Sequence, residues 1–489
     1  MSRRARELFC GVALATAAAA AAAQPLQPCR VPGLKNEVQC GHVVRPLDPA
    51  RPQGPTFELH YVVVPGTARH KSADPVVLLA GGPGQSAIDV GPSVFGLFAR
   101  LNNRRDIVFV DQRGTGRSAP LQCDEDRLAP LAQRLDPQVQ ERRLEACRAG
   151  FVGRPPVREP RDLAFFTTTL AMQDLEAVRL QLGVAQWNLV GASYGTRAAL
   201  EYLRLYPQAV RRAVLDGVAP PDMLLPASLS VDAQSAFDGV FAACAAEPRC
   251  QAQYPTLRRD WDTLQAALPR VASVQHPVTG RTESIEVTRE ILAGAVRGSL
   301  YLPALASGLP AAITAAAQGR YDALLGLASQ RGVGRAGRIA EGMHFAVTCT
   351  EDVPGGAPAD APVLGIGDGS AALYRRICAH WPRGDLAPEF RRVPTFARPV
   401  LVFSGGADPA TPPRHGARVA QALGPAARHV VVPQAGHGVL GLPCVRDVLF
   451  RFVDAADAAA AAAVDAGCAL GVPRPMAFVP IGAASGASR

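Results

Sequence analysis

Short apolar runs that end in glycine-rich turns recur along this chain and alternate with stretches of helical periodicity. Runs with the length and composition of buried strands lie at 57–64, 75–80, 105–110, 187–190, 211–216, 399–403 and 429–433. Apolar positions at helical spacing predict helices over 168–182 and 196–206. Strands that alternate with helices indicate an α/β fold, in which helices cover a mostly parallel sheet.

The pentapeptide Gly-Ala-Ser-Tyr-Gly at 191–195 lies between a predicted strand and a predicted helix. Strand, G-x-S-x-G turn and helix together are typical of a nucleophile elbow, in which a strained turn lifts a serine hydroxyl above the sheet. Glycines are needed there because a side chain would collide with the neighbouring strand and helix. An ordinary tight turn is the alternative, but the flanking elements favour an elbow with Ser193 as nucleophile.

A serine nucleophile needs a histidine base and an acid, and after an elbow they follow in the order acid, then histidine. Asp408 lies in a Gly-rich turn just past an apolar strand, and His437 lies between two glycines just past the next one. Asp216 also ends a predicted strand and is a rival for the acid. We prefer Asp408 because a Gly-rich turn just past a strand places an acid where it can orient a histidine. The expected triad is therefore Ser193, Asp408 and His437.

Acyl transfer also needs N–H donors for the developing oxyanion. One should be the backbone N–H of Tyr194, which follows the serine. The other should come from the loop Gly-Gly-Pro-Gly at 81–84, whose glycines let the backbone approach a substrate closely. Gly82 is our first choice for this donor, and Gly81 is the second.

These motifs resemble the proline iminopeptidase family of α/β-hydrolases, and most closely its secreted tripeptidyl-aminopeptidase-like branch. The resemblance rests on the elbow, on Ala-Gly-Gly-Pro-Gly-Gln-Ser-Ala at 80–87, on Asp-Gln-Arg-Gly-Thr-Gly-Arg-Ser at 111–118, and on Gly-Ala-Asp-Pro-Ala-Thr-Pro and Gly-His-Gly near the C-terminus. It covers most of residues 29–468 and is weakest over 221–395. Ala80 departs from the family, because iminopeptidases usually carry histidine there.

The resemblance implies an α/β-hydrolase core with an inserted helical cap. Residues 24–220 would form the N-terminal part of the core and 221–395 the cap. Residues 396–489 would complete the core and include the tripeptidyl-aminopeptidase-like C-terminal region. Strand–helix alternation stops within 221–395, where Ala, Leu and Arg recur at helical spacing. A cap would exclude water and shape the pocket, and a helical packing unit without substrate contact is the alternative.

The start of the chain indicates export. Residues 1–23 combine an Arg-rich beginning, an apolar Ala-rich stretch and three alanines before Gln24, which is the pattern of a cleaved signal peptide. No later stretch is apolar over the length of a membrane helix. We therefore expect a periplasmic or secreted protein without an integral membrane segment after signal removal.

Cysteine usage agrees with that compartment. Ten of the 11 cysteines lie outside the predicted signal peptide, which holds Cys10. An even number in an exported protein indicates disulfides, although sequence does not determine their connectivity. Bridging of nearest neighbours is the pairing that we expect, namely Cys29–Cys40, Cys123–Cys147, Cys244–Cys250, Cys349–Cys378 and Cys444–Cys468.

Composition and motifs argue against several classes of binding partner. The formal charge is +9, but the arginines are dispersed and form no basic run, so no nucleic-acid partner is expected. Neither C-x-x-C nor H-E-x-x-H occurs, so we expect no metal and no cofactor. The partner that we expect is therefore a substrate, either a peptide or a small ester.

We expect a serine aminopeptidase that releases single residues or short peptides, such as tripeptides, from free N-termini through an acyl-enzyme. An acid should hold the substrate's ammonium group, and the candidates in the cap are, in order, Glu351, Asp352 and Glu341. The alternative for each of them is a solvated surface position with no role in binding, because acidic side chains more often lie there. A carboxylesterase with the same triad is the runner-up, and a non-catalytic binding protein with a hydrolase fold comes third.

Overall fold

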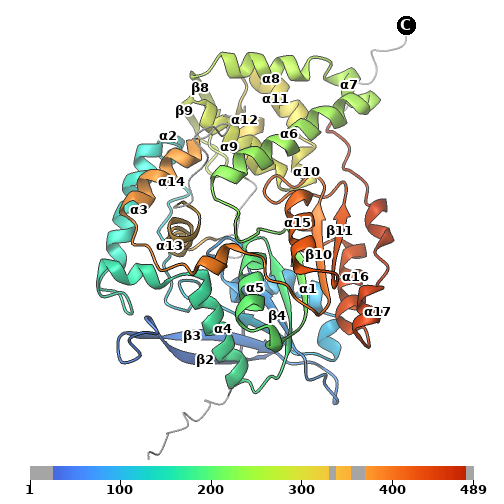
Figure 1. Cartoon of the computed structure of the whole chain (residues 1–489). Coiled ribbons are helices and arrows are strands. Elements are labelled where there is room, and N and C mark those ends of the chain that lie inside the picture. Colours follow the sequence, from blue (N-terminus) through green and yellow to red (C-terminus); the bar gives the residue numbers. More distant parts are fainter. Residues whose placement is uncertain (1–25, 330–337, 354–368, 481–489) are drawn as a thin grey trace, which may run out of the picture.

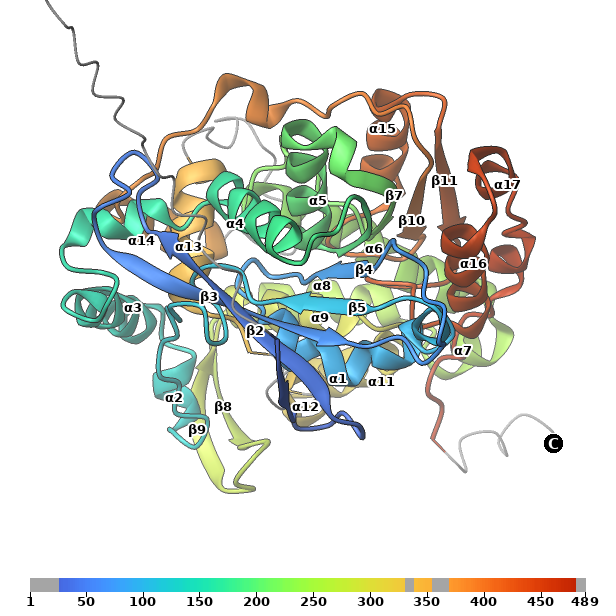
Figure 2. The same ribbon diagram turned by 90° about the horizontal axis from the view of Figure 1, so that it is seen from below.

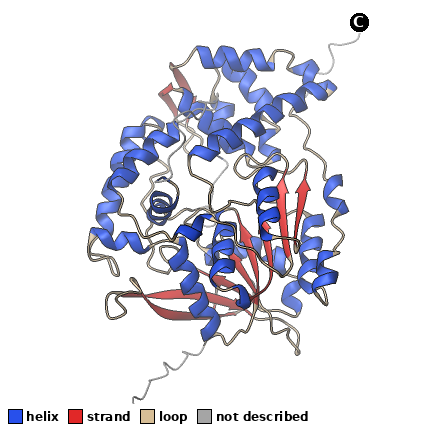
Figure 3. Cartoon of the chain, in the orientation of Figure 1, coloured by secondary structure: helices blue, strands red, loops and turns tan. Residues whose placement is uncertain are grey.

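The computed structural model describes residues 26–329, 338–353 and 369–480, and the predicted signal peptide lies outside these ranges. A twisted sheet forms the centre of the molecule, and a group of helices stands above one end of its strands (Figure 1). Figure 3 shows how helices surround the sheet. None of the helices in the described ranges combines the length and the apolar composition that crossing a bilayer requires.

The central sheet confirms the predicted fold class. Over the described residues it contains nine strands in the order β1-β2-β3-β5-β4-β6-β7-β10-β11. Neighbours from β5 to β11 are parallel, whereas β1, β2 and β3 pair antiparallel at one side. The strands span Gln27–Cys29 (β1), Val38–Pro46 (β2), Thr56–Val64 (β3), Val76–Leu79 (β4), Ile107–Val110 (β5), Trp187–Ala192 (β6), Val210–Asp216 (β7), Val400–Gly405 (β10) and Ala427–Val432 (β11). Every strand expected from the apolar runs is therefore present.

Helices cover both faces of this sheet (Figure 2). One face carries α1 (Ala87–Phe98) and α16 (Pro443–Asp454), and the other carries α4 (Thr168–Gln181), α5 (Tyr194–Leu205) and α15 (Pro413–Leu423). Strand residues alternate between the two layers, so that Val76 and Leu78 of β4 join the core under α1 while Val77 and Leu79 join the core under α5. The central strands β4 and β5 are apolar throughout because both of their faces are buried. α4 and α5 are the two helices predicted from helical periodicity.

The chain between β7 and β10 is mostly helical and stands above the sheet (Figure 1). Its helices are α6 (Ala227–Ala246), α7 (Pro248–Gln253), α8 (Leu257–Ala266), α9 (Arg289–Leu300), α10 (Pro303–Ala306), α11 (Leu309–Ala317), α12 (Asp322–Ser329), α13 (Glu341–Glu351) and α14 (Gly369–His380). An antiparallel hairpin of β8 (Arg270–Gln275) and β9 (Thr282–Val287) interrupts them, which the expected helical segment did not include. In β8, buried Ala272 and Val274 alternate with exposed neighbours, so one face of the hairpin packs on the helices.

Two helices that come before the elbow in sequence pack against the inserted segment. α2 (Leu131–Arg134) and α3 (Pro137–Phe151) precede the elbow in sequence, yet α2 contacts β9 and α3 contacts α14. The predicted boundary near residue 220 therefore separates chain segments that pack together. The division into core and cap stays a prediction.

All ten described cysteines are paired in disulfides. The bonds join Cys29 to Cys40, Cys123 to Cys147, Cys244 to Cys250, Cys349 to Cys378 and Cys444 to Cys468. These are the nearest-neighbour pairs expected from the sequence. The Cys349–Cys378 bond is notable for the site described next, because it ties α13 to α14.

Candidate active site

Ser193 lies on the turn between β6 and α5, and its backbone is strained as the predicted elbow requires. Its φ of 56° and ψ of −125° are unusual for any residue other than glycine, and such a conformation costs about 1–3 kcal/mol. The Ser193 nitrogen donates to the carbonyl oxygen of Asp216 at 2.9 Å, and the nitrogen of Thr196 donates to the Ser193 carbonyl oxygen at 2.9 Å. These bonds hold the turn in place.

Both glycines of the elbow are required by close packing. A β-carbon at Gly195 would lie 2.0 Å from the carbonyl oxygen of Leu79, at the end of β4. A β-carbon at Gly191 would lie 2.5 Å from the carbonyl oxygen of Gly195. The absence of side chains therefore lets α5 start directly against the sheet.

Four neighbouring parallel strands bring the predicted triad to one edge of the sheet. β6, β7, β10 and β11 are consecutive in the sheet. Ser193, Asp408 and His437 follow the ends of β6, β10 and β11, and Asp216 is the last residue of β7. Because the carboxyl ends of parallel strands meet at the same edge, this edge is where α/β proteins place their ligands.

Asp408 bonds to the imidazole of His437. The Nδ1 atom of His437 lies 2.8 Å from Oδ2 and 3.0 Å from Oδ1 of Asp408. Asp408 is 1% exposed, and burial alone would raise the pKa of its carboxyl. The nearby His437 and the N–H groups of Thr411 and Ala410 outweigh burial and hold that pKa below its usual value. The carboxylate is therefore ionised and able to orient the ring.

Thr411 joins this pair, although sequence reasoning did not single it out. Its hydroxyl lies 2.8 Å from Oδ2 of Asp408 and 3.1 Å from Nδ1 of His437. Its backbone nitrogen also donates to Oδ1 of Asp408 at 2.8 Å. A threonine three residues after an acid in a turn is a common local pattern, which explains why it carried no functional signal.

His437 contacts the inserted segment on one side and lies close to the end of β7 on the other. Its backbone nitrogen donates to the carbonyl oxygen of Tyr301 at 2.9 Å, and the two rings meet edge to face with centroids 5.0 Å apart. On the other side, a β-carbon at Gly217 would lie 3.3 Å from Cε1 of the imidazole. Tyr301 follows α9, so the inserted segment reaches the candidate site.

Asp216, the rival acid, bonds to backbone N–H groups, whereas Asp408 bonds to the imidazole of His437. Its carboxylate accepts hydrogen bonds from the backbone nitrogens of Val439, at 2.9 and 3.0 Å, and Leu440, at 3.0 Å. Burial raises the pKa of this carboxyl to about 6, although the two N–H groups oppose the shift. Asp216 therefore holds the backbone of the loop that carries His437, which favours Asp408 as the acid that orients the ring.

The glycine loop after β4 lies directly beside the nucleophile. A β-carbon at Gly81 would lie 3.2 Å from the β-carbon of Ser193. Gly82 has a φ of 115°, which favours glycine, and its β-carbon would lie 2.6 Å from the nitrogen of Gly84. Tyr194 begins α5, where backbone N–H groups lack helical acceptors. Gly82 and Tyr194 therefore remain the proposed oxyanion donors, with Gly81 as the alternative.

Each acid proposed to hold a substrate ammonium group has a protein partner. Glu351 accepts hydrogen bonds from the nitrogen and the hydroxyl of Thr168, both at 2.8 Å, and Asp352 pairs with Nη1 of Arg197 at 2.8 Å. Glu341 forms a two-pronged pair with Arg143 at 2.6 and 2.8 Å.

The first two acids form a buried network behind the elbow. Glu351 is 0% and Asp352 1% exposed, and burial raises the pKa of Glu351 to about 7 although Arg197 opposes the shift. The hydroxyl of Thr168 also lies 2.7 Å from that of Tyr194. Arg197 was not singled out from the sequence, because nothing in the local pattern of α5 indicates that its side chain is buried against Asp352.

Comparison with known proteins identifies the family of this chain. A family model described as "alpha/beta hydrolase fold" matches residues 74–286, and one described as "TAP-like protein" matches residues 365–463. Serine protease Hip1 of Mycobacterium tuberculosis is 28% identical over 447 residues, which cover 82% of this chain and 83% of that protein.

Two further relatives align with this chain over a similar number of residues. Tripeptidyl aminopeptidase of Streptomyces lividans is 26% identical over 478 residues, covering 89% of this chain and 85% of that protein. Carboxylesterase B of M. tuberculosis is 30% identical over 431 residues, covering 79% of this chain and 78% of that protein. With its parallel sheet and matching family models, this chain belongs to the α/β-hydrolase family and is a serine-type hydrolase.

Proposed function

We propose that this protein is an exported aminopeptidase that releases single residues or short peptides from free N-termini. The observation that carries the proposal is the contact between Asp408 and His437 at the sheet edge where Ser193 lies. Relatives named as a serine protease and as a tripeptidyl aminopeptidase align with more than four fifths of the chain, which supports peptides as substrates.

The proposed reaction follows from the roles of these residues. His437 takes the proton of Ser193 as the oxygen attacks the scissile carbonyl, and the ionised Asp408 stabilises the imidazolium. The N–H groups of Gly82 and Tyr194 bind the oxyanion. His437 then gives its proton to the leaving amine, which departs with the C-terminal part of the peptide. Water, activated by the same histidine, hydrolyses the acyl-enzyme and releases the N-terminal fragment.

An acid near the nucleophile would recognise the free N-terminus, and the structure changes the order in which the candidates should be tested. The side chain of Glu341 is 28% exposed, whereas those of Glu351 and Asp352 are fully buried. Binding of an amine at Glu341 would leave the buried network around Arg197 intact. We therefore place Glu341 first, although it must share its carboxylate with Arg143.

Export to the periplasm or beyond is part of the proposal. The predicted signal peptide at 1–23 is its first support. The five disulfides are its second, because such bonds persist in oxidising compartments.

A carboxylesterase is the second candidate function, because the carboxylesterase B relative shares 30% identity with this chain. The same triad cleaves esters and amides, so the catalytic geometry does not separate the two. A non-catalytic binding protein is a weaker third candidate, because Ser193, Asp408 and His437 are all present.

Peptide substrates with free and acetylated amino ends distinguish these functions. Aminomethylcoumarin derivatives of one, two and three residues should be compared with nitrophenyl acetate, with Ser193→Ala as the blank. An aminopeptidase should hydrolyse the free peptides and lose most of its kcat/KM on acetylation. Glu341→Gln should raise KM for free peptides and leave the ester unaffected. Equal rates on free and acetylated peptides would remove the aminopeptidase proposal, and hydrolysis of the ester alone would favour the esterase.

A further inference from the structure

Helix α13 bonds to the outer side of the glycine loop that carries Gly82. The nitrogen of Ala340, just before the helix, donates to the carbonyl oxygen of Gly84 at 2.9 Å. One turn later, Nδ1 of His344 lies 3.3 Å from the carbonyl oxygen of Pro83. Two consecutive carbonyl groups of the loop are thus held by one helix.

The contacts of His344 determine its tautomer. A carbonyl oxygen can only accept, so the Nδ1 atom facing Pro83 must carry the proton. Burial lowers the pKa of His344 to about 4, so the ring is neutral and Nε2 is an acceptor. The hydroxyl of Tyr374 lies 2.7 Å from Nε2 and must therefore donate. Burial also raises the pKa of Tyr374 to about 12, which keeps that proton in place. A chain of donors runs from Tyr374 through His344 to Pro83.

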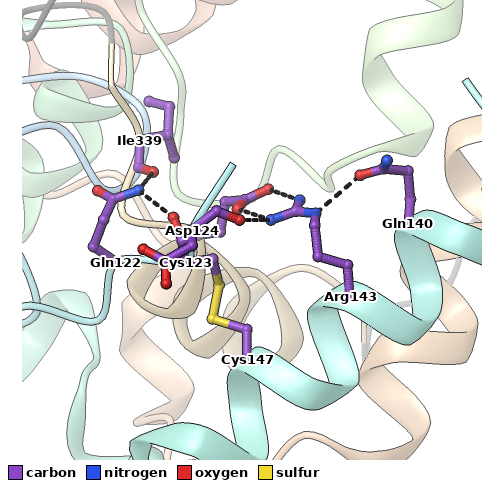
Figure 4. The surroundings of a disulfide bond; sticks show 8 residues. Gln122, Cys123, Asp124, Gln140, Arg143, Cys147 and Ile339 are labelled. Atoms are coloured by element: carbon purple, nitrogen blue, oxygen red, sulfur yellow. Dashed lines mark hydrogen bonds and ion pairs between the residues drawn. A yellow bond between two sulfur atoms is a disulfide. The ribbon is translucent and has the colours of Figure 1, made fainter. Parts of the chain in front are cut away.

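α13 itself is firmly attached on several sides. Nε2 of Gln122 donates to the carbonyl oxygen of Ile339 at 3.1 Å, beside the Cys123–Cys147 disulfide (Figure 4). The nitrogen of Gly342 donates to the carbonyl oxygen of Leu121 at 2.9 Å. The Cys349–Cys378 bond ties the helix to α14, which carries Tyr374. The helix is therefore a rigid support for the loop.

We propose that His344 is a positioning residue that holds the glycine loop in the orientation in which Gly82 can donate to the oxyanion, and that Tyr374 sets the tautomer that this requires. Inside the loop, the nitrogen of Gln85 donates to the carbonyl oxygen of Gly81 at 3.2 Å, which restrains the peptide group that carries the Gly82 N–H. The next peptide groups lack such a bond within the loop, and the positive φ values of Gly82 and Gly84 leave them free to rotate unless a neighbour holds them. Bonds from α13 to the carbonyl groups of Pro83 and Gly84 hold them in place. The inference rests on the proposed role of Gly82.

Substitutions at two positions separate this role from a general packing role. His344→Leu removes the donor to Pro83, whereas His344→Asn keeps a side-chain N–H close to the position of Nδ1. Tyr374→Phe removes the hydroxyl and leaves the ring volume. Thr348→Val is the matched control, since it changes a buried hydroxyl on the same helix that has no hydrogen-bond partner among the described residues.

Three readouts should be measured for each variant. They are kcat and KM on the best coumarin peptide, kcat and KM on nitrophenyl acetate, and the rate of labelling by a fluorophosphonate. Each of these reactions places negative charge on an oxygen in the oxyanion hole, so the test does not depend on the protein being a peptidase. Thermal unfolding of every variant shows whether it is folded.

His344→Leu should lower kcat and the labelling rate about tenfold or more while KM changes less than about threefold, because the contact acts on the transition state. His344→Asn should recover most of this loss, and Tyr374→Phe should fall between the two. Thr348→Val should match wild type. The proposal is overturned if folded His344→Leu keeps full kcat, or if Asn and Leu are equally damaging. Should His344→Leu not fold, a Tyr374→Phe variant with wild-type kcat and labelling rate would overturn it as well.

Discussion

The carboxylate of Asp216 lies 2.9 Å from the backbone nitrogen of Val439, two residues beyond His437. A second bond from Leu440, at 3.0 Å, strengthens this link between the end of β7 and the loop that carries the histidine. Asp216 acts on the backbone, whereas Asp408 contacts the imidazole itself at 2.8 Å. Two buried acids beside one histidine therefore have separable tasks.

Asp408→Asn and Asp216→Asn should accordingly differ. Asp408→Asn should lower kcat by about 10³–10⁴-fold, because the neutral amide no longer stabilises the imidazolium. It should also lower the free energy of unfolding, since Asp408 accepts buried bonds from Ala410 and Thr411. Asp216→Asn should lower kcat far less but reduce the free energy of unfolding by about 1–3 kcal/mol, since it weakens the buried bonds to Val439 and Leu440. Steady-state kinetics and urea unfolding measure both effects. If Asp216→Asn is the more damaging to kcat, the acid is wrongly assigned.

Ser193→Ala should abolish turnover without unfolding the protein, because it removes only a hydroxyl from the elbow. His437→Ala should be about as damaging, and the double variant hardly worse, since residues that act as a unit are not additive. A fluorophosphonate should label wild type and leave Ser193→Ala unlabelled, with thermal unfolding curves as the control for folding. Labelling of the Ala variant would show that another residue is the nucleophile.

Glu351→Gln should change how stability depends on pH. The pKa of Glu351 rises from 4.5 to about 7 in the folded protein because of burial, so the folded state binds more protons than the unfolded state between these values. Wild type should therefore lose stability relative to Glu351→Gln as pH rises through this window, by up to about 3 kcal/mol.

Urea unfolding at pH 4.5, 6 and 7.5 measures this difference. Glu341→Gln is the control, because it removes a carboxylate from the same helix whose ion pair is partly exposed and contributes little to stability. A constant difference between wild type and Glu351→Gln across the series would contradict the assignment of a raised pKa.

The disulfides should differ in their contributions to stability. Cys244 and Cys250 are six residues apart, whereas Cys349 and Cys378 are 29 apart. Loop-closure entropy predicts that replacing the first pair with serine costs about 2 kcal/mol and replacing the second costs about 4 kcal/mol. Mass spectrometry of unreduced digests should first show all five bonds. A larger loss from the shorter loop would mean that packing around the cysteines outweighs chain entropy.

The sequence by itself determined seven of the nine strands of the central sheet in the described residues, the elbow and the order of the predicted triad, because each depends on local pattern. A strand buried on both faces reads as a continuous apolar run, as at Val76–Leu79. A serine in a strained turn requires glycines beside it, and Gly191 and Gly195 are visible without any structure. Short-range disulfide pairs were also predictable, since their partners lie in the same local unit.

Only the tertiary structure decided which distant groups meet. Asp216 and Asp408 both end strands, and they became distinguishable only when one was found beside Val439 and the other beside the ring of His437. Glu351 is buried where the end of α13 meets Thr168 of α4 and Arg197 of α5, a contact that no local pattern encodes. The contact of His344 with Pro83 spans 261 residues of sequence. Such contacts depend on how whole elements pack, so they appear only once the chain is folded.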